Sequence, residues 1–188
     1  MNIKRWPISA TTMEEMISKW SSCCACAIGK RARKHVFERG SRDSKAIFVG
    51  EGPGRSEDVV GQPFIGRSGQ LLNRAIGDAG WDPRKLYFCN LVLCRPSDAL
   101  GGPNRSPSEE EIERCALHLL QTFHFIKPKV VVWLGRTPQE FAEAHVEARL
   151  GWINYFLPHP SHILRTGGLQ SPRYRGYVLE IREALRYA

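Results

Sequence analysis

Four cysteines are the residues of this chain whose type and spacing indicate chemistry most directly. Cys23 and Cys26 form a C-x-x-C pair on a predicted turn, Cys94 follows a predicted strand, and Cys115 lies inside a predicted helix. One close pair and two distant single thiolates can complete a tetrahedral ligand shell. The residue types alone fit either a zinc ion or an iron–sulfur cluster.

The alternative to a metal site is that Cys94 and Cys115 are ordinary buried residues, as free cysteines often are. A lone C-x-x-C pair is a moderate signal, so spacing alone leaves both interpretations open. We expect Cys89, on a predicted strand, to be a core residue. Cys24 can replace Cys23 as a ligand only if the geometry of the turn shifts.

Apolar runs that alternate with amphipathic segments must position these cysteines. The predicted strands are residues 45–50, 85–93, 129–135 and 152–158. Each is almost entirely apolar, which is typical of a parallel sheet covered by helices on both faces. We therefore predict one α/β domain over residues 1–188, a three-layer α/β/α sandwich with a central four-stranded parallel sheet.

Helical spacing and capping residues mark the segments between the strands. The predicted helices are residues 11–20, 70–80, 106–126, 137–148 and 172–188, and the predicted loops are residues 30–44, 94–107 and 159–168. Residues 51–69 are glycine-rich and too irregular for one element. Thr11 or Thr12 can cap the first helix and Ser106 or Ser108 the long one. Gly80 can end its helix.

The carboxyl ends of the predicted strands indicate where a site should lie. Ligands bind beyond these ends in parallel sheets. There the sequence places the glycine-rich residues 50–54, Asn90, Gly135 and His159. We therefore expect a site built from these four strand ends.

The composition is that of a globular protein with a basic surface. The formal net charge is +8 and the sequence pI is about 9.4. Arginines and lysines gather in two stretches, Lys30, Arg31, Arg33, Lys34, Arg39 and Arg42, then Arg165, Arg173, Arg175, Arg182 and Arg186. Such stretches suit a polyanion, and a plain solvated surface is the alternative.

No apolar run reaches the roughly 20 residues of a membrane helix, and the first residues lack the apolar core of a signal peptide. We expect a soluble, cytoplasmic protein with no membrane partner.

Four segments, in order along the chain, resemble the family 4 uracil-DNA glycosylases. They are GEGPGRSEDVVGQPFIGRSGQLLN (50–73), FCNLVLCRP (88–96), NRSPSEEEIERC (104–115) and HPSHIL (159–164). The resemblance implies a uracil-DNA glycosylase-like fold, hydrolysis of the N-glycosidic bond of uracil in DNA to leave an abasic site, and a flipped-out nucleotide. It also implies a 4Fe–4S cluster on the four cysteines, rather than zinc.

The resemblance assigns roles to residues at the strand ends. His159 would donate to uracil O2 as the bond breaks, Asn90 would pair with O4 and N3–H, and Phe64 would stack on the base. Glu51 is the nearest carboxylate that could position the attacking water, because GEGPG lacks the aspartate of some other uracil glycosylases. We expect Glu57 to bind its own loop, and Asp58 likewise.

The remaining expected contacts are backbone and DNA contacts. Gly52, Pro53 and Gly54 would let the backbone approach the base and the phosphate closely. Residues 161–165 follow the histidine, and Ser161, His162 and Arg165 would contact DNA, with an apolar wedge entering the duplex. A plain surface loop is the alternative.

The chain also departs from the family pattern. Leu93 stands where the family usually has lysine, and Ser161 and His162 follow His-Pro where small residues are common. The arginine/histidine insertion of relatives that trap DNA covalently is absent, so we expect no covalent adduct. The expected partner is uracil-containing DNA, single- or double-stranded, bound by a monomer. Two alternatives stay open: a catalytically weak or altered-specificity DNA-binding module that acts on another base or recruits a partner, and a zinc-bearing structural protein.

Overall fold

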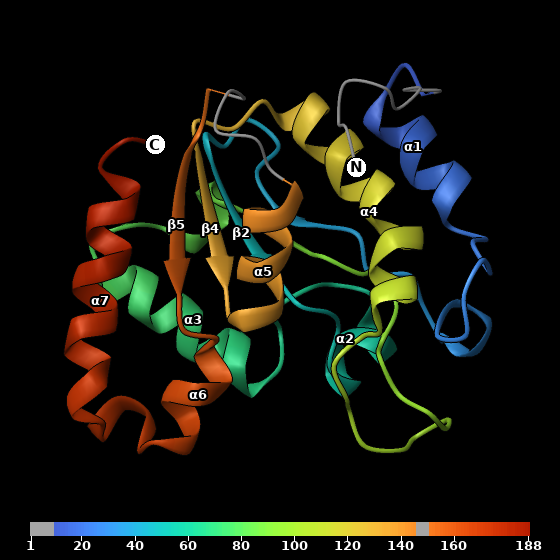
Figure 1. Ribbon diagram of the computed structural model, residues 1–188. Coiled ribbons are helices and arrows are strands. Elements are labelled where there is room, and N and C mark those ends of the chain that lie inside the picture. The colour runs from blue at the N-terminus through green and yellow to red at the C-terminus, as the bar shows by residue number, and fades with distance from the viewer. Residues whose placement is uncertain (1–9, 146–150) are drawn as a thin grey trace.

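A mixed five-stranded sheet forms the centre of the computed structural model, which describes residues 10–145 and 151–188 (Figure 1). The strand order is β1-β3-β2-β4-β5. Its four parallel strands are β2 (Ala46–Gly50), β3 (Tyr87–Asn90), β4 (Val130–Leu134) and β5 (Ile153–Leu157). All four lie inside the predicted strands. Their register pairs Gly50 with Asn90, so the glycine-rich motif and the asparagine stand side by side.

The prediction of four strands was one short. β1 (Arg39–Gly40) pairs antiparallel with β3, within residues 30–44 that were predicted as a loop. A strand of two residues has no side-chain period to detect. Gly40 has φ +103°, and a Cβ there would lie 1.8 Å from the Leu86 carbonyl oxygen, so this edge requires glycine.

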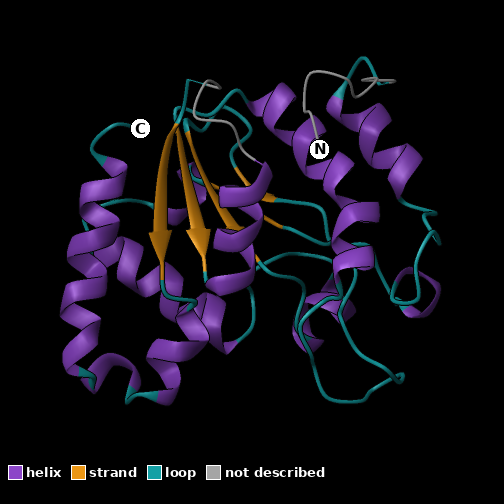
Figure 2. Ribbon diagram, in the orientation of Figure 1, coloured by secondary structure: helices purple, strands orange, loops and turns teal. Residues whose placement is uncertain are grey.

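Helices cover both faces of the sheet, which confirms the three-layer α/β/α architecture (Figure 2). α3 (Arg67–Asp78) and α7 (Pro172–Leu185) pack on the face that carries Phe48 and Val132. α1 (Met13–Trp20), α4 (Glu109–Ile126) and α5 (Arg136–His145) pack on the opposite face. Alternate residues of β2, β3 and β4 enter opposite cores, as the two-residue period of a strand requires.

Two short helices lie where no helix was predicted. α2 (Arg55–Val60) falls within residues 51–69 and α6 (Pro160–Arg165) within residues 159–168. Each has six residues, too few for an amphipathic period to show in the sequence. Short 3-10 turns complete the chain at η2 (Gly29–Arg31), η3 (Pro83–Lys85) and η5 (Gly168–Gln170).

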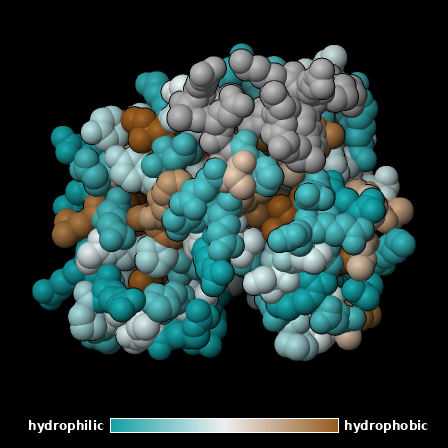
Figure 3. Space-filling view, viewed as in Figure 1, coloured by the Kyte–Doolittle hydropathy of each residue, from teal (hydrophilic) through white to brown (hydrophobic). Residues whose placement is uncertain are grey.

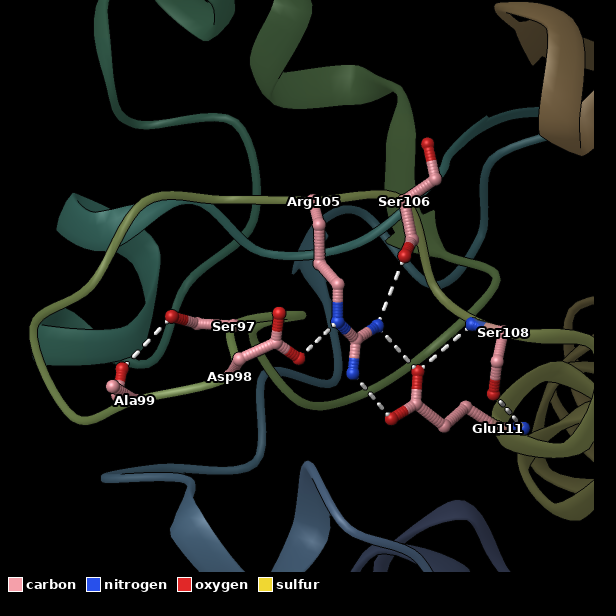
Figure 4. Close-up of polar contacts among 7 residues, drawn as sticks. All are labelled: Ser97, Asp98, Ala99, Arg105, Ser106, Ser108 and Glu111. Atoms are coloured by element: carbon pink, nitrogen blue, oxygen red, sulfur yellow. Dashed lines mark hydrogen bonds and ion pairs between the residues drawn. The ribbon is translucent and has the colours of Figure 1, made fainter.

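The predicted caps of the long helices are confirmed. Thr12 caps α1, and Ser108 forms a capping box with Glu111 at the start of α4 (Figure 4). Residues 146–148, predicted as the end of a helix, lie outside the described residues. Among the described helices, none is long and apolar enough to cross a membrane.

Candidate active site and cysteine cluster

A cavity of about 520 Å³ opens at the carboxyl ends of the parallel strands. Figure 3 shows this edge of the molecule notched below the sheet, with mostly hydrophilic residues around the notch. The predicted site residues that line the cavity are Glu51, Gly52, Pro53, Gly54, Phe64, Asn90, His159, Ser161 and Arg165. The structure thus brings together every predicted base- or DNA-contacting residue except His162.

The hydrogen bonds of His159 assign its tautomer. The Ser161 backbone N–H donates to Nδ1 at 3.2 Å, and the Ser161 hydroxyl lies 2.8 Å from the same nitrogen. A nitrogen that accepts a backbone N–H carries no proton, so in the neutral ring the proton lies on Nε2. No described residue binds Nε2, which leaves it as a free donor on a ring that lines the cavity.

The surroundings of His159 keep its imidazole neutral. Burial, followed by the nearby Arg165 charge, lowers the pKa of His159 from 6.5 to about 4. Neutral imidazole is therefore the form present at pH 7. The site offers a neutral hydrogen-bond donor at the end of β5.

Asn90 is a buried amide without a hydrogen-bond partner for its side chain within the described residues. It is 3% exposed and ends β3 on the cavity wall. A Cβ on Gly50 would lie 2.5 Å from Asn90 Oδ1 and 2.6 Å from Phe64 Cζ. The side chain lies on the cavity wall, where a polar ligand can supply hydrogen-bond partners to its amide.

Phe64 occupies the left-handed backbone region, with φ +56°. For a residue with a side chain this conformation costs roughly 1–2 kcal/mol. Its ring is nearly buried, lines the cavity and lies 5.8 Å from the ring of Phe88, centroid to centroid. Strain of this kind is commonly found where a side chain must face a ligand.

The acidic residues near the cavity are fixed by hydrogen bonds. Glu51 Oε2 accepts from the Thr137 hydroxyl at 2.7 Å. Glu57 Oε1 accepts from the N–H groups of Ile65 and Gly66 at 3.1 and 2.8 Å, so Glu57 does bind its own loop.

The Asp58 carboxylate instead accepts a hydrogen bond from the backbone N–H of Arg33, which lies in the basic segment before β1. Glu57 also lines the cavity, a position that the motif alone did not indicate.

Residues 161–165 differ from the expected DNA-contacting loop because they form α6. Ile163 is 1% exposed and belongs to the core, so it cannot supply an apolar wedge. His162 binds Arg173 through Nε2 at 2.9 Å and lies off the cavity. Arg165 donates to Ser161 Oγ at 3.2 Å, and both residues line the cavity and an adjoining groove with Arg55 and Arg67.

Sequence reasoning missed one wall of the cavity, residues 104–106. Arg105 in this wall is held by Asp98 and by both carboxylate oxygens of Glu111, at 2.7–2.8 Å (Figure 4). Glu111 is buried, and its ion pair with Arg105 lowers its pKa. The wall is therefore tied to the first turn of α4. NRSP in the sequence shows no period that would have revealed it.

Several arginines of the predicted basic stretches serve the fold. Arg42 pairs with Glu14 and Glu38. Arg182 donates to the backbone carbonyls of Asp78 and Ala79. The groove beside α6, which is lined by Arg55, Arg67 and Arg165, is a more defined basic surface than the two basic stretches of the sequence.

The four predicted ligand cysteines line one small cavity. Cys23 and Cys26 reach it from the turn after α1, Cys94 from the loop after β3 and Cys115 from α4. Cys24 is exposed and lies outside this cavity.

Cys89, the remaining cysteine, is buried in the core as expected. Within the described residues, no three His, Cys, Asp or Glu side chains form a group that could hold a metal ion.

The donor set fits a group with four sulfur ligands. Burial is the main cause that raises the pKa of Cys94, and burial also raises the pKa of Cys115 to about 12. Thiolates form in such surroundings only beside positive charge, which a bound metal centre supplies. The Leu93 N–H already donates to Cys115 Sγ at 3.3 Å, and such hydrogen bonds stabilise a ligating sulfur.

Comparison with known proteins agrees with this geometry. Residues 37–182 match the family model described as "Uracil DNA glycosylase superfamily". The chain is 38% identical to the Type-4 uracil-DNA glycosylase of Thermotoga maritima over 89% of this chain and 90% of that protein. It is 34% identical to the protein of the same name from Archaeoglobus fulgidus, over 69% of this chain and 63% of that protein. The Saccharolobus solfataricus protein is 36% identical over 61% of this chain and 51% of its own length.

Proposed function

Because this chain belongs to the uracil DNA glycosylase superfamily, we propose that it hydrolyses the N-glycosidic bond of uracil in DNA and leaves an abasic site. One observation carries the proposal. A neutral histidine with a free Nε2–H and a buried asparagine without a partner line the same cavity. Together they offer donors and an acceptor that match the polar edge of uracil.

Asn90 provides base recognition in this proposal. Its amide N–H can donate to O4 while its oxygen accepts from N3–H. Cytosine presents the opposite donor and acceptor pattern at these two positions, so with the amide in this orientation it leaves both Asn90 groups unpaired. A buried site that loses its hydrogen bonds in this way rejects the wrong ligand strongly.

His159 provides stabilisation of the leaving group. Cleavage of the glycosidic bond moves negative charge onto uracil, and Nε2–H donates to O2, where part of that charge accumulates. A neutral donor suffices, so the low pKa of the ring favours this role. In this proposal Glu51 orients the attacking water, which its position on the cavity wall and its hydrogen bond from the Thr137 hydroxyl support.

Phe64 and the basic groove complete the binding of DNA. The Phe64 ring stacks on the extruded base, and Arg55, Arg67 and Arg165 lie where the phosphates of the backbone would pass. Contacts of this second kind position the strand without reading its sequence.

A 4Fe–4S cluster held by Cys23, Cys26, Cys94 and Cys115 completes the proposal, and its part is structural: it cross-links the three segments that carry these residues. Each thiolate of such a cluster binds its own iron, so the ligands do not have to meet at one point. The metal content of the purified protein distinguishes an iron–sulfur cluster from a zinc ion. Zinc without iron would contradict the cluster.

The experiment that tests the activity uses an oligonucleotide with one uracil and a matched one with thymine. Wild-type protein should convert the uracil strand to an alkali-labile abasic product and release free uracil. The thymine strand should stay intact. DNA binding without any uracil release would contradict the proposed glycosylase activity and would favour a DNA-binding module instead.

A further inference from the structure

The loop that carries Phe64 is fixed on both sides of this residue. Glu57 accepts hydrogen bonds from Ile65 and Gly66, which follow it. A Cβ on Gly69 would lie 2.0 Å from the Phe64 carbonyl oxygen, so α3 closes against the loop without space for a side chain. The left-handed backbone of Phe64 is thus held by its surroundings.

Arg39, on the short strand β1, holds the other side. Its Nε donates to the carbonyl oxygen of Pro63, the residue before Phe64, at 2.9 Å. Its Nη2 donates to Asn73 Oδ1 on α3 at 3.0 Å. One guanidinium therefore connects the loop to the helix that packs behind it.

Arg39 also contacts the ring beside Phe64. Its guanidinium carbon lies 4.1 Å from the centroid of the Phe88 ring. Phe88 in turn packs against Phe64. Arg39 forms no ion pair with any described residue, so its hydrogen bonds serve neutral groups around the loop. An arginine used in this way arranges its neighbours through its planar fork, which lysine lacks.

We propose that Arg39 is a positioning residue for base recognition, which holds the Phe64 ring in its stacking position through Pro63 and Phe88. This inference rests on the proposed function, in which Phe64 stacks on the extruded uracil. It assigns Arg39, a member of the first basic stretch, to the base pocket rather than to phosphate contact.

The first arm of the test measures the loop without activity. Amide hydrogen exchange of Ile65 and Gly66 is compared in wild type and Arg39→Met, with Leu72 in α3 as the internal reference. We expect faster exchange of the loop amides and unchanged exchange of Leu72, because α3 loses only a side-chain contact and keeps its backbone hydrogen bonds. Unchanged loop exchange in a folded variant overturns the proposal. Hydrogen exchange can be measured even if the wild-type protein releases no uracil. Absence of uracil release would refute the proposed function and would leave the positioning role of Arg39 in the loop to be decided by the exchange data.

The second arm measures kcat/KM for uracil release. Arg39→Met should lower it roughly tenfold, the scale expected when a stacking contact weakens. Arg39→Lys should lower it less, because the ammonium group can still donate a hydrogen bond to one of the two acceptors. In a Phe64→Leu background the same Arg39→Met change should cost less than about twofold, since its effect acts through that ring. Equal losses in both backgrounds would overturn the proposal.

Arg84→Met is the matched control for these variants. Arg84 is exposed and lies before β3, at the end of the sheet opposite the cavity. Among the residues that the structure describes, its side chain binds only Asp82. It should leave both exchange and kcat/KM unchanged. If Arg39→Met fails to fold, the same two measurements are made on Arg39→Lys. The proposal would then be overturned if this variant had both the loop exchange and the kcat/KM of the wild-type protein.

Discussion

Replacement of His159 by alanine should slow the chemical step far more than it weakens binding. The ring presents one donor, Nε2–H, to the place where charge develops on uracil. Loss of one such donor typically costs about 10²–10³ in kcat, or roughly 2.7–4 kcal/mol. Because the charge is largest in the transition state, KM should change little.

Single-turnover release of uracil is the assay that isolates this step. His159→Gln is the matched variant, because its terminal amide still carries N–H donors, and it should keep more activity than His159→Ala. The melting temperature of each variant shows whether the fold is intact. A folded His159→Ala protein with uracil release within about threefold of wild type would refute the reasoning.

The pH dependence tests the same residue from another side. Burial lowers the pKa of His159 to about 4, so the neutral donor persists from pH 8 down to about pH 5. The rate should therefore not fall across this range through titration of His159. It should decrease as the pH approaches 4, because protonation of Nδ1 breaks the hydrogen bond from the Ser161 N–H that orients the ring.

The linkage to stability has a defined sign. The native ring binds fewer protons than the unfolded one between pH 6.5 and 4, so the unfolding free energy should decrease as the pH falls through that window. An NMR titration midpoint near 6.5 for His159, with a rate that rises as the ring is protonated, would show that the charged ring acts instead.

Three further predictions follow from the strand ends and the cysteines. Asn90→Ala should lower kcat/KM for uracil by about tenfold to a hundredfold, because it removes two hydrogen bonds worth about 0.5–1.5 kcal/mol each; activity equal to wild type would exclude Asn90 from recognition. Gly50→Ala should destabilise the protein by about 1–3 kcal/mol and impair uracil release, because its Cβ would meet Asn90 and Phe64. Gly77→Ala in α3, with open space around the new Cβ, is the control and should be neutral or stabilising in thermal unfolding. Cys94→Ala should abolish the visible absorbance of the proposed cluster and lower the melting temperature. Cys24→Ala is the control and should preserve both. An unchanged spectrum in Cys94→Ala would refute the cluster assignment.

The sheet was predictable from the sequence because each parallel strand is an almost entirely apolar run, as in 129–135. The elements that escaped prediction are those whose burial has no repeating pattern. β1 has two residues, and α2 and α6 have six each, so tertiary contacts rather than periodicity decide their conformation.

The candidate site was predictable only as a set of residue types at strand ends. The tautomer of His159 depends on a backbone N–H two residues further along the chain. The left-handed backbone of Phe64 depends on contacts with distant segments, including Arg39. The wall at Arg105 depends on an ion pair with the start of α4. Such features arise from the folded geometry and leave no trace in local spacing.

Segments that are far apart in the chain line the cavity, including Glu51 after the end of β2 and His159 after the end of β5. In the sheet, β4 lies between β2 and β5, so β4 must pair with both strands before Glu51 and His159 can line one cavity. No contiguous fragment shorter than most of the chain can therefore contain a working site. Activity should disappear together with the cooperative unfolding of the whole sheet, so that catalysis would report on global folding as faithfully as a spectroscopic probe.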